Sequence, residues 1–301
     1  MHPAYSIIIF TTLSGLGYGL AVMLGLGFLD PSVLPTKIAH VTALALIGIG
    51  LSSSLLHLGN PQRAWRALSQ WRSSWLSREG VMAIATFAPL TSNAALCLFM
   101  NRQDGILGLI TVLGALITVY CTSMIYASLK TVDSWHTRLT PLCFMLFSLS
   151  GGALLAGIFA GPNGLSLQLL ALLLLLVALV AKMVWRQRAR TLIPLSTPES
   201  ATGLGSIGKV RLLERPHSLD NYLTREMGFR VARKHARKLW AIALLFGAVL
   251  PILALLAAMA LGGGLIAQII LAIGIAGHMV GIFVERWLFF AEARHAVMNY
   301  Y

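Results

Sequence analysis

The sequence predicts an all-α integral membrane bundle of eight transmembrane helices, and three observations support this fold class. Of the 301 residues, 57% are hydrophobic and only 11% are charged, whereas a soluble domain carries about 25% charged residues. The hydrophobic residues fall into eight runs, each close to the roughly 20 residues that cross a bilayer. The charged residues gather between those runs. The formal charge of +13 therefore indicates basic loops rather than a nucleic-acid-binding surface.

In chain order, the spans are predicted at residues 5–29, 38–58, 80–100, 106–129, 139–160, 165–185, 239–261 and 265–290. The first run is expected to remain as a span, because the segment before it lacks the charged region and cleavage site of a signal peptide. Gly15 and Gly19 have the spacing of closely packed membrane helices, although a glycine-rich span without such a contact is an equal alternative. Gly262, Gly263 and Gly264 predict a tight turn before the last span.

Residues 1–301 are expected to form a single membrane domain, with residues 186–238 as its basic cytoplasmic loop. Gly203–Gly208 within this loop fits the pattern GxGxxG. No strand is predicted before it, so a flexible loop is a better interpretation than a nucleotide site. Residues 219–238 are predicted to be a basic helix that lies on anionic lipid or on a partner protein.

The distribution of basic residues predicts the orientation of the bundle. With eight spans, both termini lie on one side. Of the 23 Lys and Arg residues, all but Lys37 and Arg102 fall on that side or at its helix ends. The bias persists when the long loop is left out. The positive-inside rule therefore predicts that both termini are cytoplasmic.

The connection between the second and third spans concentrates the polar chemistry of the protein. It holds His57, Glu79 and three of the 7 Trp residues, although the whole chain has only 10 acidic residues. Reaction with a quinone requires proton-exchanging groups and an apolar slot with aromatic walls. We therefore expect a quinone site that contains His57, Glu79, Arg78, Trp71 and Trp75. The alternatives are a Glu79 that snorkels to water and tryptophans that belong to an interfacial belt.

A second polar segment, residues 124–136, lies on the same side of the membrane. Tyr126 is expected at the end of the fourth span, where its hydroxyl needs a partner, and is included in the quinone site. Lys130 is expected either to pair with Asp133 or to contact a ligand or a partner subunit. Partner docking is expected to involve the basic side chains Arg63, Arg66, Arg72, Lys130 and His136.

The three cysteines, Cys97, Cys121 and Cys143, all lie in apolar runs without a CxxC pair. They are predicted to be small buried residues rather than ligands of an iron–sulfur cluster or zinc. We expect no metal site in this chain.

Five segments resemble the membrane anchor subunit of dimethyl sulfoxide reductase and its relatives. LLHLGNPQRAW, WRSSWLSREG and MIYASLKTVDSWHTRLTP are similar to the family as a whole. HPAYSIIIFTTLSGLGYG and GKVRLLERPHSLDNYLTREMGFRVARKHARK are similar to a subgroup, the anchors of quinone-linked sulfite dehydrogenases that face the cytoplasm. Glu79 follows Arg78 here, where the dimethyl sulfoxide reductase anchor has a neutral residue.

The resemblance implies an anchor without haem or catalytic residues of its own. Its partners would be a four-cluster iron–sulfur subunit and a molybdopterin catalytic subunit in a bacterial inner membrane. It also implies a site for ubiquinone or menaquinone near His57 and Glu79. Because this end of the bundle is predicted to be cytoplasmic, sulfite oxidation is favoured. The anchor of a dimethyl sulfoxide reductase that oxidises menaquinol is the alternative.

Two other classes remain open at this point. A haem b anchor would need paired histidines at one depth, and His278 has no evident partner at its depth. A transporter would need charged side chains within the spans or broken helices in repeated halves. No Asp, Glu, Lys or Arg is expected in the middle of a span.

Overall fold

The computed structural model describes residues 3–55, 60–161, 164–193, 196–211, 213–214 and 231–299. The described residues form helices and turns without strands. The first six long helices are α1 (Tyr5–Gly25), α2 (Leu34–Leu55), α3 (Trp75–Met100), α4 (Gly105–Ala127), α5 (Leu139–Phe159) and α6 (Leu165–Thr191). The last two are α9 (Val231–Leu244), which continues through the π-helical η4 (Leu245–Val249) into α10 (Leu250–Ala260), and α11 (Leu265–Ala291).

Eight of these helical segments are long and apolar enough to cross a membrane, which confirms the predicted spans. Five boundaries differ from the prediction by four residues or more. The first span ends at Gly25 rather than at residue 29, and the second begins at Leu34 rather than at residue 38. The third begins at Trp75 rather than at residue 80, the sixth continues to Thr191, and the seventh begins at His235. Polar residues at these ends are therefore helical. Glu79 lies inside α3, and Lys182 lies well inside α6.

Short elements occupy the connections: η1 (Pro61–Gln70), α7 (Pro198–Thr202), η3 (Leu204–Ser206) and η5 (Ala296–Asn299). Gly203 has a positive φ of 70° and ends α7. The glycine-rich pattern is therefore a helix cap followed by a 3₁₀ turn, and the described residues before it contain no strand. The predicted basic helix is seen from Val231 onward, and residues 219–230 lie outside the described part of the protein.

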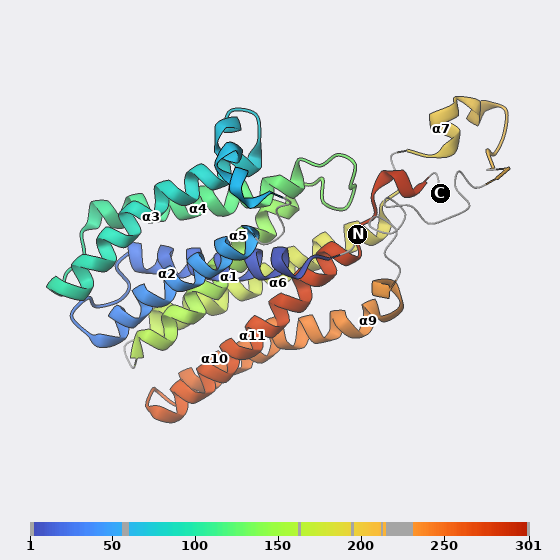
Figure 1. The fold of residues 1–301 in the computed structure, drawn as a ribbon. Coiled ribbons are helices and arrows are strands. Elements are labelled where there is room, and N and C mark those ends of the chain that lie inside the picture. The colour runs from blue at the N-terminus through green and yellow to red at the C-terminus, as the bar shows by residue number, and fades with distance from the viewer. Residues whose placement is uncertain are drawn as a thin grey trace.

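Helix α1 is the centre of the bundle. It packs against α2, α4, α5 and α11, and a larger share of it is buried than of any other span. The α3–α4 pair lies on one side of it and α9–α11 lies on the other (Figure 1). We call the end where α1, α3 and α5 begin the N-terminal face. Helices α2, α4, α6 and α11 end there.

Glycines allow close contacts between the helices. A Cβ atom at Gly19 of α1 would overlap the backbone of Ser148 and Gly152 in α5. A Cβ at Gly281 of α11 would overlap the backbone of Gly247 in η4. Small residues at such points allow membrane helices to gain van der Waals contact without a hydrophobic driving force. At Gly15 a Cβ would meet no atom within 4 Å, so of the two glycines only Gly19 is required by packing.

The turn between α10 and α11 agrees with the sequence prediction. Gly262, Gly263 and Gly264 have φ values of 66°, 107° and 91°. Only glycine adopts such values without strain. The π-helical η4 frees a carbonyl within the span, and the Nδ1 atom of His278 lies 2.7 Å from the carbonyl oxygen of Gly247. An internal partner of this kind is needed where lipid supplies none.

We expect Gly19→Val to push α1 and α5 apart and to destabilise the protein by about 1–3 kcal/mol, because the added atoms overlap backbone rather than a flexible side chain. Thermal unfolding in detergent micelles measures the effect. Gly48→Val is the matched control, since a Cβ at Gly48 meets nothing within 4 Å. Equal unfolding temperatures for the two variants would contradict this account of the packing.

Candidate functional site

Glu79 is a buried carboxyl group at the N-terminal face. It lies about one turn into α3, and only 4% of its surface is exposed. The hydroxyl of Thr122 in α4 donates a hydrogen bond to its Oε1 atom. Among the described residues, Glu79 makes no ion pair. Burial of a carboxyl group without a cation partner is costly when the group is charged.

The hydrogen bonds of Thr122 support a proton on Glu79. The Thr122 hydroxyl lies 3.1 Å from the carbonyl oxygen of Thr118 as well as in contact with Glu79. A hydroxyl has one proton to donate but can also accept. When Glu79 is charged, Thr122 can donate to Glu79 or to Thr118 but not to both. A protonated Glu79 would let both contacts form, with Glu79 donating to Thr122 and Thr122 donating to Thr118.

Arg78 lies beside Glu79 in sequence but binds elsewhere. Its Nε atom donates to the carbonyl of Trp71 at 3.0 Å, and its Nη2 atom donates to the carbonyl of Arg72 at 2.7 Å. Its guanidinium carbon lies 4.3 Å from the centre of the Trp75 ring. Arg78 therefore fixes the connection before α3 and leaves Glu79 without an opposite charge.

The predicted aromatic residues do not form one slot. Trp75 packs edge-on against Tyr120 of α4, with ring centres 6.0 Å apart, whereas Trp71 is 53% exposed. The ring of Tyr126 is buried among four aromatic rings at 5.2–5.7 Å, from Trp135, Phe144, Phe289 and Phe290. Tyr126 follows Thr122 by one turn of α4. His57, the other predicted proton-exchanging residue, lies outside the described residues.

The predicted docking residues are all exposed at the N-terminal face. Arg63 and Arg66 lie in η1, Arg72 lies in the turn after it, and Lys130 and His136 lie between α4 and α5. Both connections project from the same end of the bundle (Figure 1). They form a basic surface whose side chains are accessible to an acidic partner.

A groove of about 610 Å³ opens between the ends of α4 and α5 on the same face. It is lined by Tyr120, Met124, Ala127, His136, Thr137, Arg138 and Pro141. The Nδ1 atom of His136 lies 2.7 Å from the carbonyl oxygen of Ala127, which holds the imidazole in place. The groove has room for a quinone ring, and the Trp75–Tyr120 contact joins its wall to α3. Glu79 meets a different side of α4, at Thr122.

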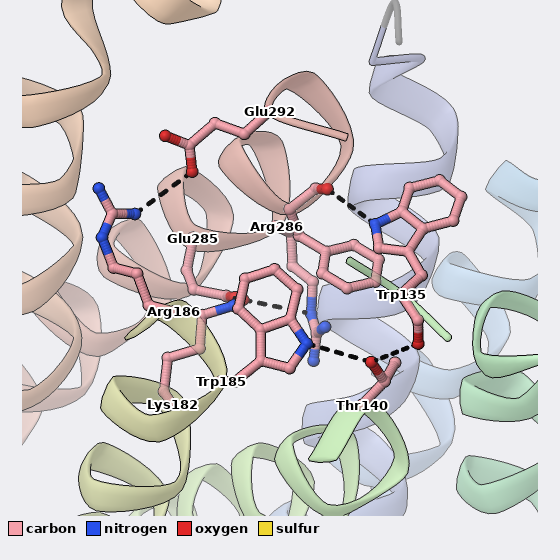
Figure 2. Close-up of polar contacts among 9 residues, drawn as sticks. Trp135, Thr140, Lys182, Trp185, Arg186, Glu285, Arg286 and Glu292 are labelled. Carbon is pink, nitrogen blue, oxygen red and sulfur yellow. Dashed lines mark hydrogen bonds and ion pairs between the residues drawn. The ribbon is translucent and has the colours of Figure 1, made fainter. Parts of the chain in front are cut away.

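A cluster of charged residues inside the bundle was not predicted (Figure 2). Lys182 of α6 forms an ion pair with Glu285 of α11, and both side chains are nearly fully buried. The Nε atom of Arg286 lies 3.7 Å from Glu285 Oε2. The expectation that the spans lack charged residues away from their ends is therefore wrong. Because all three residues fall inside the predicted spans, the signal was present in the sequence.

Aromatic rings surround these charges. The Nζ atom of Lys182 lies 3.7 Å from the centre of the Trp185 ring, and the guanidinium carbon of Arg286 lies 3.6 Å from the centre of Phe144. Such cation–π contacts compensate for part of the lost hydration. Nearer the N-terminal face, Arg186 Nη1 pairs with Glu292 Oε2 at 3.2 Å. The cluster thereby joins α6 to α11, which are far apart in sequence.

Two tryptophans tie the connection between α4 and α5 to the cluster. Trp135 Nε1 donates to the carbonyl of Phe289 at 3.0 Å, and Trp185 Nε1 donates to Thr140 Oγ1 at 3.1 Å (Figure 2). Thr140 in turn donates to the carbonyl of Trp135 at 2.8 Å. These hydrogen bonds hold the α4–α5 connection, which carries part of the basic surface, against α6 and α11.

The described histidines give no support to a haem pair. The Nδ1 atoms of His278, His40 and His136 each lie 2.7–3.0 Å from a backbone carbonyl oxygen. His278 faces η4 and α5, whereas the Nε2 atom of His40 faces Gln103. All three cysteines are buried, as predicted. The described residues contain no group of three or more His, Cys, Asp or Glu placed to hold a metal.

The protein matches the family model of the DMSO reductase anchor subunit (DmsC) over residues 1–207. It is 31% identical over 329 aligned positions to the C subunit of sulfite dehydrogenase from Allochromatium vinosum, and the alignment covers 100% of this chain and 99% of that protein. It is 31% identical over 145 residues to the C subunit of anaerobic dimethyl sulfoxide reductase from Escherichia coli, which covers 46% of this chain and 50% of that protein. The corresponding protein of Haemophilus influenzae is 32% identical over 124 residues, 40% of this chain and 44% of that protein.

We expect Glu285→Gln to destabilise the protein by about 3–5 kcal/mol, because it leaves the buried Lys182 without its partner. Glu292→Gln is the matched control. The Glu292 side chain is 32% exposed, so water can replace it beside Arg186 and its loss should cost less than the loss of Glu285. Reversible unfolding in mixed micelles measures both. A smaller effect for Glu285→Gln than for Glu292→Gln would show that the interior pair is not needed for stability.

Proposed function

We propose, on the premise that the protein belongs to the DMSO reductase anchor subunit (DmsC) family, that this integral membrane protein binds quinone and anchors a sulfite dehydrogenase. It passes electrons between a partner iron–sulfur subunit and the quinone pool. Glu79 carries the proposal, as a buried carboxyl group without a counter-ion among the described residues at one membrane surface. The likeness along its whole length to the sulfite dehydrogenase protein of Allochromatium vinosum supports the choice of substrate for the partner subunit.

Quinone takes up two electrons and two protons when it is reduced to quinol, and the electrons come from the partner. Glu79 supplies one proton to a quinone oxygen at the N-terminal face, and Thr122 holds the carboxyl group in position. His57 is the proposed second proton-exchanging residue. The quinone ring is proposed to lie on the α3 side of α4, where Trp75, one turn before Glu79, packs against Tyr120. Arg78 fixes the preceding connection.

The partner complex is proposed to dock on the N-terminal face. Arg63, Arg66, Arg72, Lys130 and His136 are exposed there, and the basic loop joins the same side. The excess of Lys and Arg supports a cytoplasmic position for this face, so the iron–sulfur and molybdopterin subunits would work on the cytoplasmic side of the bacterial inner membrane. Electron transfer then needs only the short distance from a surface cluster to the quinone site.

A second function is favoured by a different observation. The family model matches residues 1–207, which include Glu79, and the dimethyl sulfoxide reductase proteins match 40–46% of this chain. In this alternative the anchor oxidises menaquinol for a sulfoxide reductase, and Glu79 accepts the proton instead of donating it. Residues 208–301, outside the family model, align with the sulfite dehydrogenase protein, and we therefore prefer the first function.

We expect Glu79→Gln to reduce quinone-coupled turnover of the complex by roughly 100-fold, the contribution typical of a positioned acid–base group. Glutamine keeps the shape and a hydrogen bond to Thr122 but cannot release a proton. Turnover is measured with decylubiquinone or menadione, and dye-coupled activity of the soluble subunits should stay normal. Asp30→Asn, on the opposite face, is the control. Normal quinone rates in Glu79→Gln would remove Glu79 from the site.

Membranes that contain the complex should catalyse sulfite-dependent reduction of a quinone analogue. The matched assay is quinol-dependent reduction of dimethyl sulfoxide in the same membranes. Sulfoxide activity alone would reverse the proposed direction and argue against the cytoplasmic placement of the N-terminal face. Activity with neither substrate would reject both proposed partners.

A further inference from the structure

A polar cavity lies inside the bundle between α1, α4, α5 and α11. The space inside it that water can occupy is about 20 Å³, which is room for roughly one or two water molecules. It is too narrow for a quinone ring. The polar residues that line it are Thr11, Thr12, Ser14, Tyr18, Thr122, Ser148 and Arg286.

Two hydroxyl groups in this cavity lack a protein partner. Thr12 and Tyr18 are each only 2% exposed, and neither Thr12 Oγ1 nor the Tyr18 hydroxyl makes a hydrogen bond within the protein. A buried polar group left unsatisfied costs about 1–3 kcal/mol, and cavities that hold such groups are normally occupied by ordered water. The cavity therefore has both the room and the polar partners that bound water requires.

The cavity reaches Glu79 on one side. Thr122 lines it and contacts the carboxyl group of Glu79. The Tyr18 hydroxyl approaches Thr118, one turn further along the same face of α4, without reaching hydrogen-bond geometry. Water between Tyr18 and Thr122 thus lies within one hydrogen bond of the residue that holds Glu79.

The cavity reaches the buried charges on its other side. Arg286 lines it, and Arg286 contacts Glu285, the partner of Lys182. Glu79, Thr122 and Arg286 all lie about one to one and a half turns from their helix ends at the N-terminal face, a depth of roughly 6–8 Å at 1.5 Å per residue. The Glu79–Thr122 contact and the Arg286 side chain therefore lie at similar depths in the bundle.

We propose that water bound in this cavity, beside Tyr18 and Thr122, is the proton route to Glu79. The route rests on the proposed function in one respect, namely that Glu79 exchanges its proton with quinone. When Glu79 gives a proton to quinone, the Thr122 hydroxyl donates its own proton to Glu79 and takes one from the cavity water, which regains a proton by exchange with solvent. Leu16, Val119, Phe147 and Ile282 form the apolar part of the cavity wall.

A dry cavity and a water-filled cavity predict opposite effects for Tyr18→Phe and Thr12→Val. In a dry cavity these variants remove unsatisfied hydroxyls, so the protein becomes more stable and no rate changes. In a water-filled route they remove the groups that hold the water. We then expect exchange of the Glu79 proton with D₂O to slow by roughly tenfold, equivalent to about 1.4 kcal/mol in the barrier.

Infrared spectroscopy of the complex in D₂O measures this exchange. The carboxylic acid band of Glu79 is assigned by its absence in Glu79→Gln, and its shift is followed with time. The measurement needs no quinone, so a failure of the quinone proposal and a failure of the water route give different results. Quinone-coupled turnover should fall in parallel, while dye-coupled activity stays normal.

Gly15→Ala tests the same route without removing a polar group. Gly15 lines the cavity, and a Cβ there meets no atom within 4 Å, so the methyl group should displace water. Gly48→Ala is the matched control, because its Cβ also meets open space and Gly48 does not line the cavity. Normal proton exchange in Gly15→Ala together with Tyr18→Phe would overturn the proposal.

Discussion

The interior of a membrane protein offers no bulk water to solvate a charge, and this constraint explains the arrangement of the buried polar groups. Each such group must find a partner within the protein. Lys182 and Glu285 neutralise each other, and Arg286 is placed over the Phe144 ring. Glu79 has a hydroxyl partner but no cation among the described residues. That exception distinguishes a group able to change its charge from groups that keep theirs.

The same constraint connects stability and function. Helix α1 has no charged residue and contributes small and hydroxyl-bearing side chains to its neighbours. Its glycines bring α5 close, while its hydroxyls leave a polar cavity against α4 and α11. Helix α1 therefore lies between two groups of helices. One is α6 and α11, which carry the buried ion pair, and the other is α3 and α4, where quinone binding is proposed. The buried ion pair and Glu79 thus lie near one surface of the bundle.

The sequence was sufficient to predict the spans but not to predict which residues contact their polar side chains. Hydrophobic length identified all eight helices, and Gly262–Gly264 identified the last turn. Glu79 stands out in the sequence because acidic residues are rare in this protein. Thr122 does not, because the contact depends on how α3 packs on α4, which spacing along one helix does not reveal. Lys182 is easily assigned to a loop, because a charged residue usually marks the end of a span. Its partner Glu285 lies inside the predicted eighth span.

The long separation of Lys182 and Glu285 in the sequence has a consequence for biogenesis. Spans enter the bilayer in the order of synthesis. Lys182 of α6 therefore has no ion-pair partner in the membrane until α11 has been inserted. A charged residue in mid-helix weakens insertion by about 2.5–3.5 kcal/mol, but the strongly apolar remainder of α6 can hold it in place. When α10 and α11 arrive as a hairpin around the glycine turn, Glu285 meets a lysine that is already in the membrane. Formation of the ion pair then marks a fully inserted anchor, ready for its soluble partners.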